Sequence, residues 1–149
     1  MKLYIVRHGD YDTTDILQRL NQKGTQDIQR VADYLRDQGV RVREIWHSPK
    51  RRAAESAEIF QTALQCAVIK EKDSASPNAV PDAVMEDLAA QDEDILIVSH
   101  LPFIPRLLTE FMMQAEEESP RFPTAAVAVL ERTGGQWRQI DFINPEFLS

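Results

Sequence analysis

Short apolar runs alternate with segments of helical periodicity along this chain, and the alternation limits the folds open to it. Strands alternating with helices imply a mostly parallel sheet covered on both faces. Two final strands meet at Gly134 and Gly135 as a hairpin, which adds an antiparallel edge. The predicted class is α/β, a three-layer α/β/α fold. We expect its strands at residues 3–6, 42–47, 67–70, 95–99, 125–130 and 136–142, and its helices at 21–39, 48–64, around 84–88 and within 102–113.

Two helix boundaries are marked by capping residues. In the first helix, apolar residues recur with a spacing of three and four, Asn21 is suited to cap the start, and Gly39 to end it. In the second, Ser48 resembles an N-cap and Pro49 the first helical residue. We therefore expect the second helix to open directly at the end of the second strand.

Composition indicates a single domain over residues 1–149 that binds neither nucleic acid nor membrane. The net charge is −7, whereas both of those partners favour clustered Lys and Arg. No apolar run approaches the ~18 residues of a membrane helix. A single cysteine, Cys66, allows no internal disulfide, so we expect a cytoplasmic protein, and we expect a monomer. The acidic balance also favours a substrate carried on a protein surface over a small free polyanion.

Polar residues of one chemical kind follow three of the predicted strands. Arg7 and His8 come after the first, Arg52 follows the second in the run 48–52, and His100 follows the strand at 95–99. The carboxyl ends of parallel strands open on the same edge of a sheet, so these side chains are expected to converge. Two arginines and two histidines would repel one another unless an anion lies between them, which points to a phosphoryl group.

Neighbouring residues have simpler interpretations. Arg51 shares a helix stripe with Glu55 and Glu58 and is expected to form solvated ion pairs. Lys50 is expected to be a solvated first-turn residue or a peripheral attraction for anions. His47 ends a strand without motif support, so we expect a structural role for it.

Two further groups are also expected to be structural. Trp46 and Trp137 are expected to lie in the core. The run Glu116–Glu118 fits a solvated helix end, with a docking patch as the alternative.

These motifs, in this order and in a chain this short, resemble the histidine phosphatase superfamily with its phosphoglycerate-mutase-like fold. Within that family they are similar to the small SixA-type phosphohistidine phosphatases. The resemblance rests on Arg7-His8-Gly9-Asp10, Leu20 with Gly24, Ser48-Pro49 with Arg52, Ala53 and Ser56, Ser99-His100-Leu101-Pro102, and Phe122-Pro123-Thr124-Ala125.

The resemblance implies that His8 is the nucleophile and forms a phosphohistidine intermediate. It implies that Arg7, Arg52 and His100 steady the phosphoryl oxygens, with Gly9 and Asp10 completing the substrate-binding set. His8 must be neutral to attack, whereas His100 must donate a hydrogen bond and is compatible with a cationic state. The chain has three histidines, and its acidic residues show no ligand spacing, so we expect no metal and no cofactor.

The residue that would protonate a leaving oxygen is not fixed by these motifs. Asp10, Glu71 and Asp73 are the candidates, and Asp10 could instead pair with Arg7. An alkoxide needs such an acid, whereas an imidazole leaving group, with a pKa of ~6.5, takes a proton from solvent.

The leading hypothesis for function is therefore a phosphohistidine phosphatase that acts on a phosphorylated protein, such as a histidine-containing phosphotransfer domain. The alternatives are a phosphatase of small phosphomonoesters and a non-catalytic module that binds phosphate.

Overall fold

A computed structural model describes residues 1–112 and 121–148 of the chain. The run Glu116–Glu118 lies outside the described residues. Helices and strands alternate as the sequence predicts, with short 3-10 turns among them. The elements are β1 (Lys2–Arg7), α1 (Gln22–Asp37), β2 (Glu44–His47), α2 (Arg51–Leu64), β3 (Ile69–Glu71), η1 (Asp73–Ala75), α3 (Asp82–Ala89), β4 (Ile95–Ser99), α4 (Phe103–Met112), β5 (Val127–Thr133), β6 (Gln136–Ile143) and η3 (Pro145–Phe147).

The strands form one six-stranded sheet in the order β3-β2-β4-β1-β5-β6. The first four strands in this order run parallel, and β5 and β6 add the antiparallel edge that was predicted. Arg7 at the end of β1 pairs in register with Ser99 at the end of β4. His47 at the end of β2 pairs with Val98. The carboxyl ends of β1, β2 and β4 therefore meet at one edge of the sheet.

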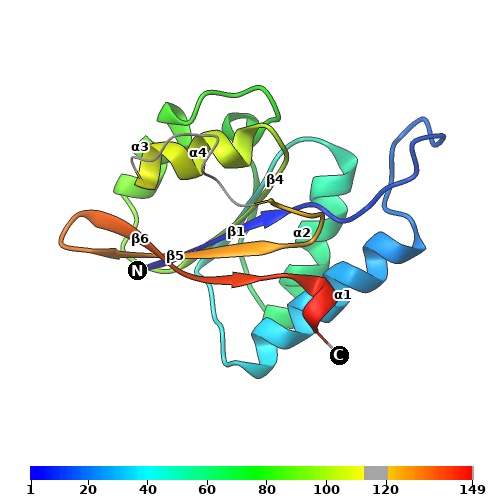
Figure 1. The fold of residues 1–149 in the computed structure, drawn as a ribbon, viewed down its shortest axis with the longest axis horizontal. Coiled ribbons are helices and arrows are strands. Elements are labelled where there is room, and N and C mark those ends of the chain that lie inside the picture. The colour runs from blue at the N-terminus through cyan, green and yellow to red at the C-terminus, as the bar shows by residue number, and fades with distance from the viewer. Residues whose placement is uncertain (113–120, 149) are drawn as a thin grey trace.

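Helices cover both faces of the sheet, so the predicted three-layer α/β/α class is confirmed. Figure 1 shows α3 and α4 on one side and α1 on the other. Side chains alternate along β1: Tyr4 and Val6 face the core under α1 and α2, whereas Leu3 and Ile5 face the core under α3 and α4. A strand that is buried on both faces explains why β1 reads as a continuous apolar run.

The predicted start of the first helix is confirmed, and that of the second is wrong. The Asn21 side chain accepts a hydrogen bond from the backbone of Gly24, as an N-cap does. Ser48 does not cap α2, because the backbone continues along the sheet: Ser48 N donates to Val98 O at 3.2 Å. Lys50 is still extended, at φ −65° and ψ 140°, and α2 begins at Arg51. The Ser48 hydroxyl is thereby free for another partner.

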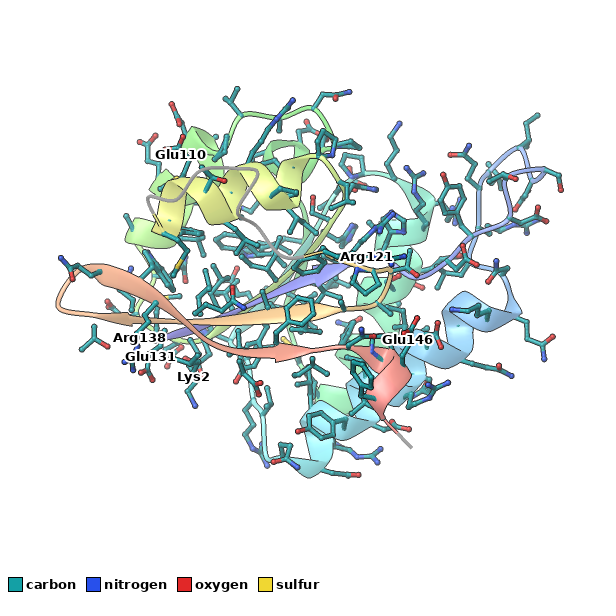
Figure 2. The ribbon with its side chains drawn as sticks, in the orientation of Figure 1. Lys2, Glu110, Arg121, Glu131, Arg138 and Glu146 are labelled. Atoms are coloured by element: carbon teal, nitrogen blue, oxygen red, sulfur yellow. The ribbon has the colours of Figure 1, made fainter. Side chains whose placement is uncertain are left out.

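The other end of the sheet, where β1 begins, carries a row of alternating charges. Lys2 on β1 pairs in register with Glu131 on β5, and Glu131 with Arg138 on β6. Figure 2 shows these three residues together at one end of the sheet, while Arg121 lies toward the other end, where β1 ends. Opposite charges across neighbouring strands stabilise the pairing.

Of the residues expected in the core, Trp46 and Cys66 are buried and Trp137 is half-buried. Trp46 is buried, with Nε1 donating to Glu44 Oε1 at 3.1 Å, and Cys66 is buried as expected. Trp137 is half-buried and packs against Phe111 with a centroid separation of 4.9 Å. No helix among residues 1–112 and 121–148 has the length and apolar character needed to cross a membrane.

Candidate active site

His8 occupies the first position after β1 and is held there on both sides. Its backbone N–H donates to Ser99 O at 3.1 Å, and its carbonyl accepts from Ala125 N at 3.1 Å. The side chain is 3% exposed, and Nδ1 lies 2.8 Å from Gly9 O. A carbonyl oxygen can only accept, so Nδ1 carries the proton. In the neutral ring the lone pair is therefore on Nε2, the atom a nucleophile would use.

Burial and charge keep the His8 ring neutral. Its pKa is lowered to about 4, mainly by desolvation and to a smaller extent by the guanidinium groups of Arg52 and Arg7. The hydrogen bond to Gly9 and the charge of Asp10 act in the opposite direction but are outweighed. At neutral pH the imidazole is uncharged, as the sequence argument requires of a nucleophile.

His100 follows β4, and its ring lies against that of His8. The two ring centroids are 4.8 Å apart and the planes are tilted by 51°. Burial is the largest cause that lowers the pKa of His100 to about 3, followed by the electrostatic interactions with His8, Arg52, Lys50 and Arg7. This direction favours a neutral His100 ring at pH 7 over the cationic state that the sequence also allows.

Ser48 sets the proton position on His100. The Ser48 hydroxyl contacts His100 Nε2 and accepts from Lys50 N at 3.3 Å. The Lys50 amide can only donate, so the Ser48 hydroxyl contacts no other acceptor among the described residues, and we assign its proton to the contact with His100 Nε2. The His100 proton is then on Nδ1, a buried atom for which residues 1–112 and 121–148 offer no acceptor.

Two guanidinium groups complete the cluster. Arg7 donates from Nη1 to Phe122 O at 2.8 Å. Arg52 stacks over the ring of Tyr11, with Cζ 4.5 Å from the centroid, and donates from Nη1 to Gln18 Oε1 at 3.0 Å. These contacts fix the orientation of both planar groups and leave their other N–H groups for a ligand.

The Nε atoms of Arg7 and Arg52 share one property with Nδ1 of His100. All three are buried, and none has a hydrogen-bond partner within the described part of the chain. Buried donors without acceptors are rare and require an explanation. Arg7 ends β1, Arg52 lies in the first turn of α2 and His100 follows β4; the two arginines are close enough to His8 to depress its pKa, and the His100 ring lies against that of His8. An oxyanion bound beside His8 would offer acceptors to donors of this kind and relieve the repulsion between the arginines.

Gly9 and Asp10 support the site rather than line it with donors. Gly9 N donates to Ser56 Oγ at 3.0 Å, and a Cβ at Gly9 would lie 2.8 Å from Gly24 O. The Asp10 carboxylate accepts from Tyr11 N at 3.1 Å and from Asn21 Nδ2 at 3.0 Å. Both carboxylate oxygens therefore hold the loop and the start of α1. The alternative pairing of Asp10 with Arg7 is not found as an ion pair among the described residues.

The remaining candidates lie outside this cluster. Glu71 and Asp73 are exposed, as are Lys50 and Arg51. Instead of the predicted pairing with Arg51, Glu55 accepts a hydrogen bond from Leu20 N at 2.8 Å. His47 is buried and its Nδ1 lies 2.8 Å from Ser48 O, consistent with a structural role.

Tyr11, Gln18 and Ser48 are site residues that the sequence argument missed. Tyr11 and Gln18 lie in a polar loop without periodicity, so no pattern marks them. Ser48 carries a signal, Ser-Pro before a helix, but that signal indicates a cap rather than a partner for His100. No group of His, Cys, Asp or Glu suited to holding a metal ion occurs among residues 1–112 and 121–148.

Fold and site together define a phosphatase of the histidine phosphatase type, in which a neutral imidazole lies beside donors for an oxyanion. The family model of the histidine phosphatase superfamily (branch 1) matches residues 3–74. This match, together with a relative of known activity, confirms the predicted resemblance to the histidine phosphatase superfamily.

The similar proteins include phosphatases of different substrates. The phosphohistidine phosphatase SixA of Escherichia coli (strain K12) is 26% identical over 136 residues, covering 86% of this chain and 83% of that protein. The structure of the protein histidine phosphatase SixA complexed with tungstate covers 97% of each chain with a TM-score of 0.89 at 23% identity. A phosphoserine phosphatase from Entamoeba histolytica, complexed with phosphoserine, shares the fold with a TM-score of 0.76 at 13% identity over 97% and 98% of the two chains.

Proposed function

We propose that this protein removes the phosphoryl group from a phosphohistidine of a partner protein, such as a histidine-containing phosphotransfer domain. The observation that carries the proposal is the state of His8: its Nδ1–H donates to Gly9 O, so Nε2 keeps a lone pair in a ring that burial holds neutral. A neutral imidazole with its lone pair free is the form that attacks phosphorus.

In the proposed first step, His8 Nε2 attacks the phosphorus of the substrate and the P–N bond to the substrate imidazole breaks. The leaving imidazole takes a proton from solvent. The N–H groups of Arg7, Arg52 and His100 hold the equatorial oxygens, where a loose phosphoryl transition state concentrates its charge. In the second step water attacks the phosphorus on His8, the P–Nε2 bond breaks, and inorganic phosphate leaves. No metal or cofactor is required.

The engagement of Asp10 supports a nitrogen leaving group over an oxygen one. Its two carboxylate oxygens accept bonds from Tyr11 N and Asn21 Nδ2, so Asp10 is already committed as a support for the loop. Ester hydrolysis needs an acid for the departing alkoxide, whereas imidazole, with a pKa of ~6.5, departs readily with a proton from water.

The relatives support the same substrate class. The relative from Escherichia coli is described as a phosphohistidine phosphatase, and a SixA structure was solved with tungstate, a tetrahedral oxyanion of the shape expected between Arg7, Arg52 and His100. The single cysteine agrees with action in a reducing cytoplasm.

The test compares the wild type with His8→Ala, in the presence of a chelator, on a phosphohistidine protein and on a panel of phosphate esters. We expect phosphate release from phosphohistidine by the wild type alone, and an acid-labile, base-stable phosphoryl group on His8 in rapid-quench samples. Ester turnover at a comparable kcat/KM would instead support the phosphomonoesterase. Oxyanion binding without any turnover would support the non-catalytic module.

A further inference from the structure

The geometry points to a docking surface for the phosphorylated partner at the rim of the active site. We call it the apolar rim, and it consists of Ile16 and Leu17 on the loop after β1 together with Leu101 after β4. The inference rests on the proposed function, because the expected occupant is the protein that carries the phosphohistidine. It adds that recognition extends beyond the phosphoryl group to the surrounding protein surface.

The loop that presents Ile16 and Leu17 is ordered by its own polar groups. Asp12 N donates to Arg19 O at 3.0 Å, and Gln18 N donates to Asp15 O at 2.9 Å. The Asp15 carboxylate also pairs with Arg19 Nε at 2.7 Å. Figure 1 shows the loop, in dark blue, projecting beyond the end of the sheet. These contacts favour the loop conformation that exposes the apolar tip, and a preformed surface loses less entropy on binding.

The apolar rim is joined to the phosphate-binding groups at both of its ends. Gln18, next to Leu17, accepts from Arg52 Nη1 at 3.0 Å. Leu101 directly follows His100, whose ring lies against His8. A protein that places a phosphorylated side chain beside His8 therefore brings its own surface onto this rim.

Half of the exposed large hydrophobic side chains follow the strands that carry the site. The described part of the chain has six of them, and three belong to the rim: Ile16 is 96% exposed, Leu17 48% and Leu101 38%. Single exposed apolar residues need no explanation, but a group beside a functional site indicates an interaction surface. A small phosphate ester held between the arginines would not cover the Ile16 side chain, whereas a protein would.

The charges at the rim suit an acidic and apolar partner surface. Lys50 and Arg51, between the end of β2 and the start of α2, are both exposed. They are cationic in a chain with a net charge of −7. A partner with acidic side chains around its phosphohistidine would be attracted to this edge and repelled by most of the remaining surface.

The experiment uses the full chain carrying Ile16→Ser with Leu17→Ser, and compares hydrolysis of a phosphohistidine-bearing phosphotransfer protein with hydrolysis of free phosphohistidine. We expect kcat/KM on the protein to fall at least tenfold, through a higher KM, while kcat/KM on the free amino acid stays within twofold. The matched control is Phe147→Ser, which removes an 84% exposed apolar side chain in η3, outside the rim. This variant should stay within twofold on both substrates.

A charge-reversal variant, Lys50→Glu with Arg51→Glu, should lower kcat/KM on the protein more at low salt than at high salt. Equal losses on both substrates would overturn the docking surface, because the loop would then only shape the phosphate pocket. Unchanged rates on the protein would overturn it as well. A wild type that is inactive on the phosphohistidine protein would overturn the proposed function itself, so the two failures are distinguishable.

Discussion

At the scale of single residues, the chemistry depends on which ring nitrogens carry protons. His8 holds its proton on Nδ1 through Gly9 O, and the contact of Ser48 with His100 Nε2, assigned with the hydroxyl as donor, leaves the His100 proton on Nδ1. The same tautomer thus gives the two rings opposite abilities: His8 presents a lone pair and His100 presents a donor. Burial keeps both rings neutral, so neither ability depends on small changes of pH near 7.

The first prediction is a low titration midpoint for His8. In ¹⁵N NMR of the imidazole, His8 should gain its second proton near pH 4, far below the ~6.5 of a free histidine, with Nε2 unprotonated at neutral pH. Arg52→Gln should raise the midpoint only partly, because burial is the larger cause. A midpoint near 6.5, or a protonated Nε2 at pH 7, would contradict the assignment of His8 as a neutral nucleophile.

Ser48→Ala is predicted to lower kcat about tenfold to a hundredfold, since it removes the group that fixes the His100 tautomer. The estimate follows from the ~1–3 kcal/mol attached to a buried polar atom without its partner. Ser99→Ala is the matched control: Ser99 is equally buried and adjacent to His100, but its hydroxyl donates to Ala75 O. Only Ser48→Ala should change the ¹⁵N pattern of His100, and Ser48→Thr should restore it. Identical effects of both alanine variants would show that Ser48 is merely structural.

At the scale of elements, the strands and helices follow from local patterns, because each is short and has either a continuous apolar run or a helical periodicity. Residues 95–99 read as a strand from their continuous apolar run, and β4 has those bounds. The turns after β1, β2 and β4 were predictable for the same reason, and with them the convergence of Arg7, His8 and His100. The contact between Ser48 and His100, which are 52 positions apart, was not predictable, because Ser-Pro alone indicates a helix cap.

The loop between β1 and α1 shows the same limit. Tyr11 supports Arg52 by stacking and Gln18 by a hydrogen bond, but neither residue lies in a periodic segment. The predicted N-cap at Asn21 was correct because capping is local, whereas its second role, donating to the Asp10 carboxylate, requires the loop to fold back onto the helix. Tertiary contacts of irregular loops leave no repeated pattern in a sequence.

Gly24→Ala tests how closely α1 must approach this loop. A Cβ at Gly24 would lie 1.9 Å from the carbonyl oxygen of Asp10, so the helix and the loop would have to separate. We expect a loss of about 1–3 kcal/mol in the free energy of unfolding, measured with urea, and a lower kcat/KM because the loop also carries His8. Gln26→Ala, at an exposed position of the same helix, should change stability by less than about 0.5 kcal/mol. Equal stability of the two variants would refute the close packing.

At the scale of the whole molecule, an acidic chain holds a local cluster of cations, so oxyanion binding should be coupled to stability. At a tungstate concentration of about 100 times its Kd, the folded state should gain about 2.7 kcal/mol, which corresponds to roughly 5–10 °C in Tm for a chain of this size. Differential scanning calorimetry measures the shift. Arg52→Gln should reduce it, whereas Arg36→Gln, on the exposed surface of α1, should not. Equal shifts in the two variants would place the oxyanion elsewhere.

The pKa values of the two buried histidines also make stability depend on pH. The unfolded chain binds protons at both rings below about pH 6.5, whereas folded His8 and His100 resist protonation down to about 4 and 3. The unfolded state therefore binds more protons over this range, and the free energy of unfolding should fall as the pH decreases from 6.5 toward 4.

Urea unfolding in phosphate-free buffer at pH 7 and pH 5 measures this loss of stability in acid. Replacing His8 by Gln should reduce the acid loss by about 1–2 kcal/mol, because carboxylate titration is common to both proteins and cancels in the comparison. Equal acid losses in the wild type and in His8→Gln would mean that folded His8 takes up its proton as readily as a free imidazole, and the neutral nucleophile would have to be abandoned.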